Sequence, residues 1–238
     1  MYKACGFVSG EPPSVGSEQL ARAVIVDKKW PRKLACCIHK RSYAGKSHHA
    51  HQTDNSTMII FKETNRLILR EIIPKDEVGF YELDSDAEVH KYIESKTIDT
   101  IEQARETIRF IRQQYIDNGI GRWAIIEKET NNFIGWTGLK LIRKETNNHI
   151  NYYDLGYRLL KKYWGNGFAT EAAIASLDYG FDKLALQEIY ADANIENVGS
   201  NNVLRKVGLR FVETFEKEGI IHHWYQIKRD DWIKMSNR

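Results

Sequence analysis

Residues 162–172 have the order Lys-Tyr-Trp-Gly-Asn-Gly-Phe-Ala-Thr-Glu-Ala, a glycine-bracketed turn that leads into an alanine-rich run. Residues 151–160 mix aromatic, branched and aliphatic side chains as a buried strand does, and the alanine-rich run has helical spacing and propensity. At a helix start the backbone N–H groups lack partners and the dipole is positive, so a glycine turn there can hold a phosphate. The pattern predicts an anion site, and glycines used for packing alone are the alternative.

A second polar segment follows the next expected strand, residues 188–193. Asn197 and Ser200 stand three positions apart in it, and a short helix is expected at 200–206. By itself this spacing is typical of a loop in which Ser200 is the N-cap of a helix.

Together the two segments resemble the GNAT N-acetyltransferases. Residues 162–172 are similar to the acetyl-coenzyme A pyrophosphate loop of that family, Q/R-x-x-G-x-G/A, and residues 197–209 to its N-x-x-S and K-x-G-F segments. Residues 64–70 supply the family's T-x-R-L-x-L-R opening, and the WGxGxATEA wording looks like the branch with ribosomal-protein N-terminal acetyltransferases. Lys162, Phe168 and Leu209 depart from the family pattern, but the implied phosphate contacts are mainly backbone amides.

The resemblance implies that acetyl-CoA is the acetyl donor. It assigns cofactor binding to Leu159, Leu160, Lys162, Trp164, Gly165, Asn166, Gly167, Phe168, Ala169, Thr170, Asn197 and Ser200. Asn197 is expected to hold the pantetheine arm and Ser200 to lie near the thioester sulfur. The N–H groups of Leu159 and Leu160 are expected to stabilise the oxyanion. Many relatives carry a proton-donating Tyr where this chain has Leu204, so Ser200 or a water must act, or the thiolate leaves unassisted.

The attacking amine must be neutral, which sets the demand for a base. At pH 7 an α-amine with a pKa near 8 costs roughly 1.4 kcal/mol to deprotonate, and a lysine near 10.4 about 4.6 kcal/mol. Asp154 is the first candidate base because relatives often carry Glu there, and a salt bridge is its alternative role. Glu171 is expected to be structural; acids in residues 76–95, His222 and His223 are further candidates. Direct attack of an amine on a thioester needs no metal.

The remaining pattern predicts an α/β GNAT fold over residues 58–238, with a mixed, mostly antiparallel sheet flanked by helices. Strands are expected near 66–70, 122–127, 133–140, 151–160, 188–193, 210–215 and 222–228. Helices are expected within 76–95, from a capping box at Thr100 to about Asp117, after Gly167, at 200–206 and at 230–234. The resemblance implies that the sheet is splayed between its fourth and fifth strands, 151–160 and 188–193, with acetyl-CoA in the gap. Tyr157 is expected in the core.

Composition excludes several classes of protein. The net charge is +3, but residues 1–57 hold nine Lys or Arg against four acids, which leaves 26 bases and 28 acids in residues 58–238. A general nucleic-acid surface is therefore not indicated. No apolar run approaches the roughly 20 residues that span a bilayer, so we expect a cytoplasmic protein without membrane contact. Neither a Walker A lysine nor a G-x-G-x-x-G string accompanies the glycine turn, which disfavours a nucleotide-binding protein.

Residues 1–57 have no sustained periodicity and contain several Gly, Pro and Ser, so we expect a poorly ordered extension outside the fold. Cys5, Cys36 and Cys37 all lie in it, near several histidines, but without the paired spacing of zinc ligands. One hypothesis is that this segment is foreign to the native protein or reflects a misassigned start codon. A protein begun at Met58 that loses stability or activity would contradict it.

These observations predict acetyl transfer from acetyl-CoA to a primary amine, by direct attack in a ternary complex. A protein N-terminal amine is the first choice of acceptor. A polyamine, an aminoglycoside or another small amine is the alternative, as is a module that binds acetyl-CoA without turnover. The family resemblance also raises the expectation of a homodimer.

Overall fold

The computed structural model describes residues 58–93 and 95–236. The expectations for residues 1–57, including the poorly ordered extension and the cysteine and histidine group, lie outside the described residues. The elements in chain order are β1 Ile60–Glu63, β2 Leu67–Glu71, η1 Pro74–Asp76, α1 Glu77–Ser85, α2 Ala87–His90, α3 Ile101–Asn118, β3 Trp123–Glu127, β4 Phe133–Ile142, β5 Tyr152–Leu159, η2 Lys161–Tyr163, α4 Phe168–Asp182, β6 Glu188–Asn194, α5 Val198–Lys206, β7 Arg210–Lys217, β8 Ile220–Lys228 and α6 Arg229–Ser236.

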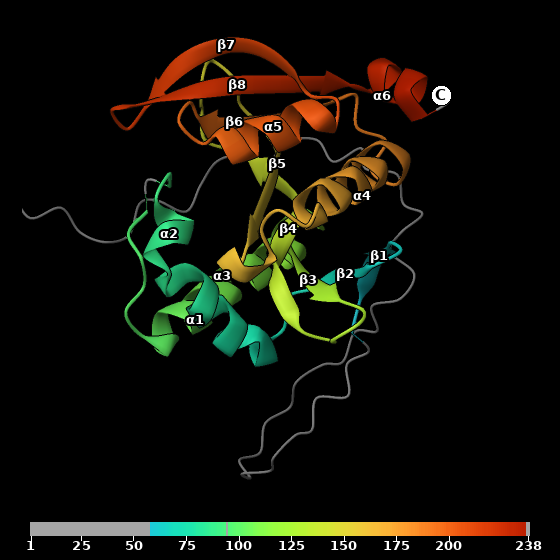
Figure 1. Cartoon of the computed structure of the whole chain (residues 1–238). Coiled ribbons are helices and arrows are strands. Elements are labelled where there is room, and N and C mark those ends of the chain that lie inside the picture. Colours follow the sequence, from blue (N-terminus) through green and yellow to red (C-terminus); the bar gives the residue numbers. More distant parts are fainter. Residues whose placement is uncertain (1–57, 94, 237–238) are drawn as a thin grey trace, which may run out of the picture. The chain divides into compact units, whose positions relative to one another are not determined.

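The described strands form one eight-stranded sheet in the order β1-β2-β3-β4-β5-β6-β8-β7 (Figure 1). All neighbouring pairs are antiparallel except β5 and β6, which are parallel and are joined by α4 as a crossover. The predicted mixed, mostly antiparallel sheet is therefore confirmed. β1, which is not among the strands expected above, pairs with β2 at the edge of the sheet.

Alternation along the strands directs side chains to two separate hydrophobic layers. On β3, Trp123 and Ile125 join the core that includes α4, while Ala124 and Ile126 pack with residues of α1 and α3. The sheet is thus covered by α4 on one face and by α1 and α3 on the other (Figure 1).

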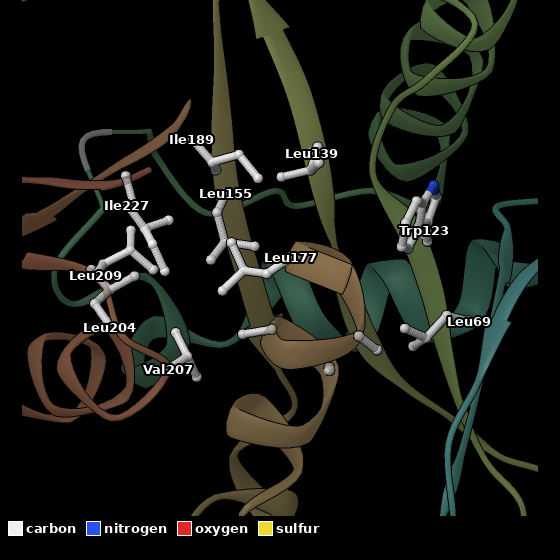
Figure 2. Packing of buried hydrophobic residues seen from close by; sticks show 14 of the residues in the cluster. Leu69, Trp123, Leu139, Leu155, Leu177, Ile189, Leu204, Val207, Leu209 and Ile227 are labelled. Carbon is white, nitrogen blue, oxygen red and sulfur yellow. The ribbon is translucent and has the colours of Figure 1, made fainter. Parts of the chain in front are cut away.

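The larger core continues from the first half of the sheet to the second. Figure 2 shows Leu155 of β5 and Leu177 of α4 lying together, with Leu204 of α5 and Ile227 of β8 in the same cluster. Burial of each such side chain contributes roughly 2 kcal/mol. This packing holds β5 and β6 in a defined relation even where they do not pair.

The capping box predicted at Thr100 begins α3. Thr100 Oγ1 accepts the Gln103 N–H at 3.4 Å, and Gln103 Oε1 accepts the Thr100 N–H at 3.0 Å. The helix ends at Asn118, and Gly119 follows with a left-handed φ of 70°. None of the helices in the described part of the chain has the length and apolarity to cross a bilayer.

Candidate functional site

Strands β5 and β6 separate soon after they meet. Among the described residues, their register contains the single pair Asp154 and Tyr190. β5 continues to Leu159, and its residues 155–159 form what we call the unpaired edge of β5. The N–H and C=O groups of such an edge require partners, so the edge offers backbone hydrogen bonds to an extended ligand.

The turn between η2 and α4 carries both glycines in left-handed backbone. Gly165 has φ 78°, and Gly167, the N-cap of α4, has φ 79°; a residue with a Cβ would pay roughly 1–2 kcal/mol for this conformation. The first hydrogen bond of α4 runs from the Glu171 N–H to Gly167 O at 3.1 Å. The N–H groups of residues 168–170 therefore lack intrahelical acceptors, and with the helix dipole they favour an anion.

A network of hydrogen bonds fastens this turn to the segment just before β2. Glu171 accepts from Thr64 Oγ1 at 2.6 Å and from Arg66 Nε at 2.6 Å. Arg66 Nη1 also donates to Asn166 O at 3.0 Å. Burial opposes ionisation of Glu171, but the hydrogen bonds from Thr64 and Arg66 outweigh it and lower the pKa of that carboxyl. Glu171 is thus held by partners within the protein and helps to shape the turn.

Arg66 also contacts the first residue of α4, a role at the turn that its place in the sequence did not predict. The guanidinium Cζ lies 4.4 Å from the centroid of the Phe168 ring, which is buried beneath it. Ala169 and Thr170 follow half-buried on the same helical turn. Two features of the sequence could have indicated this role of Arg66: the Thr64-Asn-Arg66 opening, and the acid Glu171 in the first turn of the expected helix.

Lys162 and Trp164, both expected to bind the cofactor, hold the turn in place through other partners. Lys162 Nζ pairs with Glu82 Oε1 of α1 at 2.8 Å, and this hydrogen bond raises the pKa of Lys162. Trp164 Nε1 donates to Leu159 O at 2.8 Å, which fastens the turn to the end of β5. Contacts to a phosphate then fall mainly to backbone N–H groups.

The two expected oxyanion donors differ in availability. The Leu160 N–H donates to Ile134 O of β4 at 3.0 Å, so it is engaged. Successive N–H groups of an antiparallel strand point to opposite sides. The Leu159 N–H therefore points away from β4, toward the side from which β6 has separated. Of the two residues, Leu159 is the one whose N–H can face an oxyanion.

Asn197 and Ser200 lie at the start of α5. The helix begins at Val198 and Asn197 is its N-cap, with Oδ1 accepting the Ser200 N–H at 3.0 Å. Ser200 is the third residue of the helix, so the interpretation of Ser200 as the N-cap is wrong. Since Asn197 does the capping, the Ser200 hydroxyl is available for another contact.

Tyr157 provides that contact from the unpaired edge of β5. Its Oη lies 3.1 Å from Ser200 Oγ and donates to Ser200 O at 3.0 Å. Burial raises the pKa of Tyr157 well above its usual value, against the effect of the Ser200 hydrogen bond. The ring packs on the core, as expected, but the sequence carried no signal for a contact between residues 43 positions apart.

Asn201, which sequence analysis did not single out, anchors α5. Its Nδ2 donates to Asn194 O at 2.9 Å and to Asn197 O at 2.7 Å. Its Oδ1 accepts from Tyr225 Oη at 2.7 Å and lies 2.8 Å from His223 Nδ1. The side chain is 2% exposed, so it fixes the start of α5 against β6 and β8 from within the fold.

Leu204 and Leu209 stand where the family pattern has Tyr and Phe. Both are core residues, 1% and 2% exposed, and Figure 2 shows them beside Val207 and Ile227. Leu204 therefore contributes packing, and the proton donor that relatives place at this position has no counterpart there.

Asp154 forms an ion pair with Arg122 of the loop before β3. Arg122 Nη2 donates to Asp154 Oδ2, and Arg122 Nη1 donates to Asp154 O at 2.7 Å. Burial nevertheless raises the pKa of Asp154, with the Arg122 charge opposing it. Asp154 and Tyr157 are three positions apart on one strand, so their side chains lie on opposite faces of the sheet.

His222 and His223 have partners that explain them structurally. His222 Nδ1 lies 2.7 Å from Asp192 Oδ2, and His223 Nδ1 contacts Asn201. Burial disfavours ionised Asp192, yet His222 and Lys217 outweigh it and lower the pKa of Asp192. Burial also lowers the pKa of His223.

The sheet order, the parallel β5 and β6 pair that separates, and the turn before α4 define the GNAT acyltransferase fold. The chain belongs to the GNAT acetyltransferase family: the profile of the Acetyltransferase (GNAT) domain matches residues 66–210. An uncharacterised N-acetyltransferase of Bacillus subtilis, YoaA, is 32% identical over 162 residues, 68% of this chain and 86% of that protein. The uncharacterised N-acetyltransferase p20 of Bacillus licheniformis is 33% identical over 165 residues, 69% of this chain and 87% of that protein.

Solved structures of GNAT acetyltransferases have the same fold as this chain. A GNAT acetyltransferase of Bacillus anthracis matches with a TM-score of 0.60 at 28% identity, over 73% of this chain and 99% of that one. Two less similar structures share the fold. The ribosomal-protein-S5-alanine acetyltransferase of Vibrio fischeri has a TM-score of 0.60 at 19% identity, over 74% of this chain and 99% of that one. The spermidine N-acetyltransferase of Vibrio cholerae, in complex with CoA and spermine, has a TM-score of 0.58 at 17% identity, over 71% and 99%. The protein is an acyltransferase, and its family uses acetyl-CoA.

Proposed function

We propose that this enzyme acetylates a primary amine in a ternary complex with acetyl-CoA, and that a protein N-terminal amine is its preferred acceptor. One observation carries the proposal: the unpaired edge of β5 has an anion-binding turn at one end and the Asn197 and Ser200 pair across from it. These are the groups that an extended thioester with a pyrophosphate requires.

The residues present fit acetyl-CoA as the acetyl donor. Backbone N–H groups of residues 165–170 would hold the pyrophosphate, helped by the positive end of α4. The unpaired edge of β5 and Asn197 would hold the pantetheine arm. Acetyl-CoA supplies an acetyl group activated as a thioester, so the protein needs to orient it and to manage one proton and one developing negative charge.

The chain's own groups suit those tasks. The Leu159 N–H points toward the separated side of β5, where it can stabilise negative charge on the carbonyl oxygen. Asp154 is our candidate base: its raised pKa makes its carboxylate a better proton acceptor than an ordinary aspartate. Because Asp154 and Tyr157 lie on opposite faces, an amine beside Asp154 and a sulfur beside Ser200 would not compete for the same space.

The acceptor class rests on proton energetics. An α-amine needs about 3 kcal/mol less than a lysine to become neutral at pH 7, so it asks less of a partly buried aspartate paired with arginine. A polyamine or aminoglycoside is the second candidate, because the Vibrio cholerae relative by fold is named for spermidine. We also propose that the protein is a homodimer and that it is cytoplasmic. Sedimentation of the full chain tests the oligomeric state.

The test is CoA release by the full-length chain, followed with a thiol-reactive dye. Acetyl-CoA is offered with peptides that carry free N-termini, with the same peptides blocked at the N-terminus but carrying lysine, and with polyamines and aminoglycosides. We expect turnover on free N-termini. Turnover restricted to small amines would move the assignment to the second candidate. Acetyl-CoA binding in calorimetry without any turnover would favour a non-catalytic module.

A further inference from the structure

The contact between Tyr157 and Ser200 spans the two strands that separate. Tyr157 belongs to the unpaired edge of β5, and Ser200 to α5, which follows β6. Tyr157 Oη is within hydrogen-bond distance of both oxygens of Ser200, at 3.0 Å and 3.1 Å. Leu204, at the position where relatives carry a proton-donating Tyr, is in the core. A hydroxyl in contact with Ser200 thus comes from a different element, β5.

We propose that Tyr157 is a positioning residue for acetyl transfer and acts through Ser200. With acetyl-CoA bound, its hydroxyl donates to Ser200 Oγ in place of Ser200 O, and this turns the Ser200 O–H toward the departing sulfur of acetyl-CoA. This inference rests on the proposed function, because it assumes a thioester beside Ser200. It adds a residue of β5 to the leaving-group side of the site.

The hydrogen count allows this arrangement. Tyr157 has one proton, which goes either to Ser200 O or to Ser200 Oγ. When it goes to Oγ, the Ser200 proton is free to turn toward a third acceptor, and each hydrogen bond in such a chain strengthens the next. Burial keeps Tyr157 protonated through the physiological pH range, so its hydroxyl remains a donor.

The chemical step balances without a proton leaving Tyr157. The bond from the amine nitrogen to the carbonyl carbon forms and the carbon–sulfur bond breaks, with its electron pair leaving on sulfur. The Ser200 O–H, oriented by Tyr157, hydrogen-bonds that thiolate. The proton lost by the amine passes through the base to solvent, and the thiolate takes a proton from water after release. A thiol with a pKa near 8.5 forms a thiolate that water stabilises well, so the hydrogen bond from Ser200 is needed only while the thiolate is buried in the site.

The first test needs no acceptor. CoA itself is bound to the full chain, its binding is verified by calorimetry, and its thiol is titrated by the ultraviolet absorbance of the thiolate. We expect the ratio of thiolate to thiol in bound CoA at a given pH to be about tenfold higher in the wild type than in Tyr157→Phe or Ser200→Ala, as a hydrogen bond to a charged group allows. Equal titration in all three proteins, or absence of CoA binding, would overturn the proposal.

Tyr153→Phe is the matched control. Tyr153 lies four residues earlier on the same face of β5, packs against the same core and has a pKa raised by burial. Within the described chain its hydroxyl makes no hydrogen bond. Its removal should leave the bound thiol titrating as in the wild type, and a shift as large as that of Tyr157→Phe would contradict a specific role for Tyr157.

Turnover gives the second test. Tyr157→Phe should lower kcat by about ten- to a hundredfold and change the KM for acetyl-CoA by less than about twofold. The double variant with Ser200→Ala should be no slower than Ser200→Ala alone, because both changes break one chain. Multiplying losses would overturn the proposal. A shifted thiol titration without turnover on any amine would reject the proposed function and retain this inference.

Discussion

Arg66 Nε donates to Glu171 Oε2 over 2.6 Å, although the two residues are 105 positions apart. The contact joins the residue before β2 to the first turn of α4, and Arg66 extends it to Asn166 O in the glycine turn. The turn that we assign to the pyrophosphate is thereby held open by the rest of the fold. This is preorganisation, and it lowers the ordering cost of binding.

Replacing Glu171 with Gln should expose the pH dependence of this network. The folded-state pKa of Glu171 is lowered from its ordinary 4.5, so its contribution is fully present above that value and is lost as pH falls through the lowered folded pKa. We expect Glu171→Gln to cost about 1 kcal/mol near neutral pH, since Arg66 is half-exposed. Urea unfolding of both proteins from about pH 7 to about pH 3 should show this difference shrinking.

Glu106→Gln is the control for that series. Glu106 pairs with Arg109 at 3.8 Å on the exposed face of α3. Its loss should change the free energy of unfolding by less than about 0.5 kcal/mol at every pH. If Glu171→Gln behaves like Glu106→Gln, the network does not support the turn.

Gly165→Ala should weaken acetyl-CoA binding. Its φ is 78° and no protein atom lies within 4 Å of an added Cβ, so a methyl group there points into open space that the pyrophosphate would need. Gly119→Ala is matched, with φ 70° and equally open space, at the end of α3. Both variants should lose about 1–2 kcal/mol of stability. Calorimetry should show reduced affinity for Gly165→Ala alone, and equal affinities would remove the phosphate assignment.

Asp154→Asn tests the candidate base. We expect kcat to fall about a hundredfold or more, with the acid limb of the kcat/KM profile lost. In the wild type that limb should lie above the ordinary aspartate value of 3.8, because burial raises the pKa of Asp154.

Asp76→Asn provides the comparison for Asp154→Asn. Asp76, in η1 after β2, forms a somewhat more buried pair with Arg70, at 2.6 Å. Both substitutions should destabilise the fold, because each weakens the only charge partner seen in the described chain for an arginine side chain that is largely removed from solvent. Only Asp154→Asn should slow turnover per folded molecule. Similar kcat values in the two variants would leave Asp154 with the salt-bridge role.

Leu204→Tyr should not restore the proton donor that relatives carry. Leu204 is 1% exposed in a core that also contains residues of α4, β6 and β8, so the larger ring should cost about 1–3 kcal/mol by overpacking. Leu204→Met, of similar volume, should cost less than about 1.5 kcal/mol. Chemical unfolding measures both. A stable Leu204→Tyr enzyme with a raised kcat would show that this position faces the cofactor after all.

Local patterns in the sequence predicted much of this fold. The capping box at Thr100, the strand before the glycine turn and the helix after it are all present, because capping, propensity and hydrophobic period act over a few residues. The motif at residues 162–172 likewise predicted the family, since its chemistry uses backbone groups whose geometry local sequence sets.

Other local predictions depended on one residue and were less secure. Ser200 has a typical N-cap side chain, but Asn197 competes for the same role and begins the helix three residues earlier. Leu159 and Leu160 could not be told apart, because which N–H points toward β4 depends on the register of the ladder, and register is a property of two strands.

What the sequence by itself determined is the order of elements, the family and the backbone turn that can hold a phosphate. Only the tertiary structure decided which side chains meet across the separated strands: Tyr157 with Ser200, Arg66 with Glu171, and Arg122 with Asp154. Those contacts join residues 32 to 105 positions apart. They depend on strand order, register and the splay of β5 from β6, none of which a local period can encode.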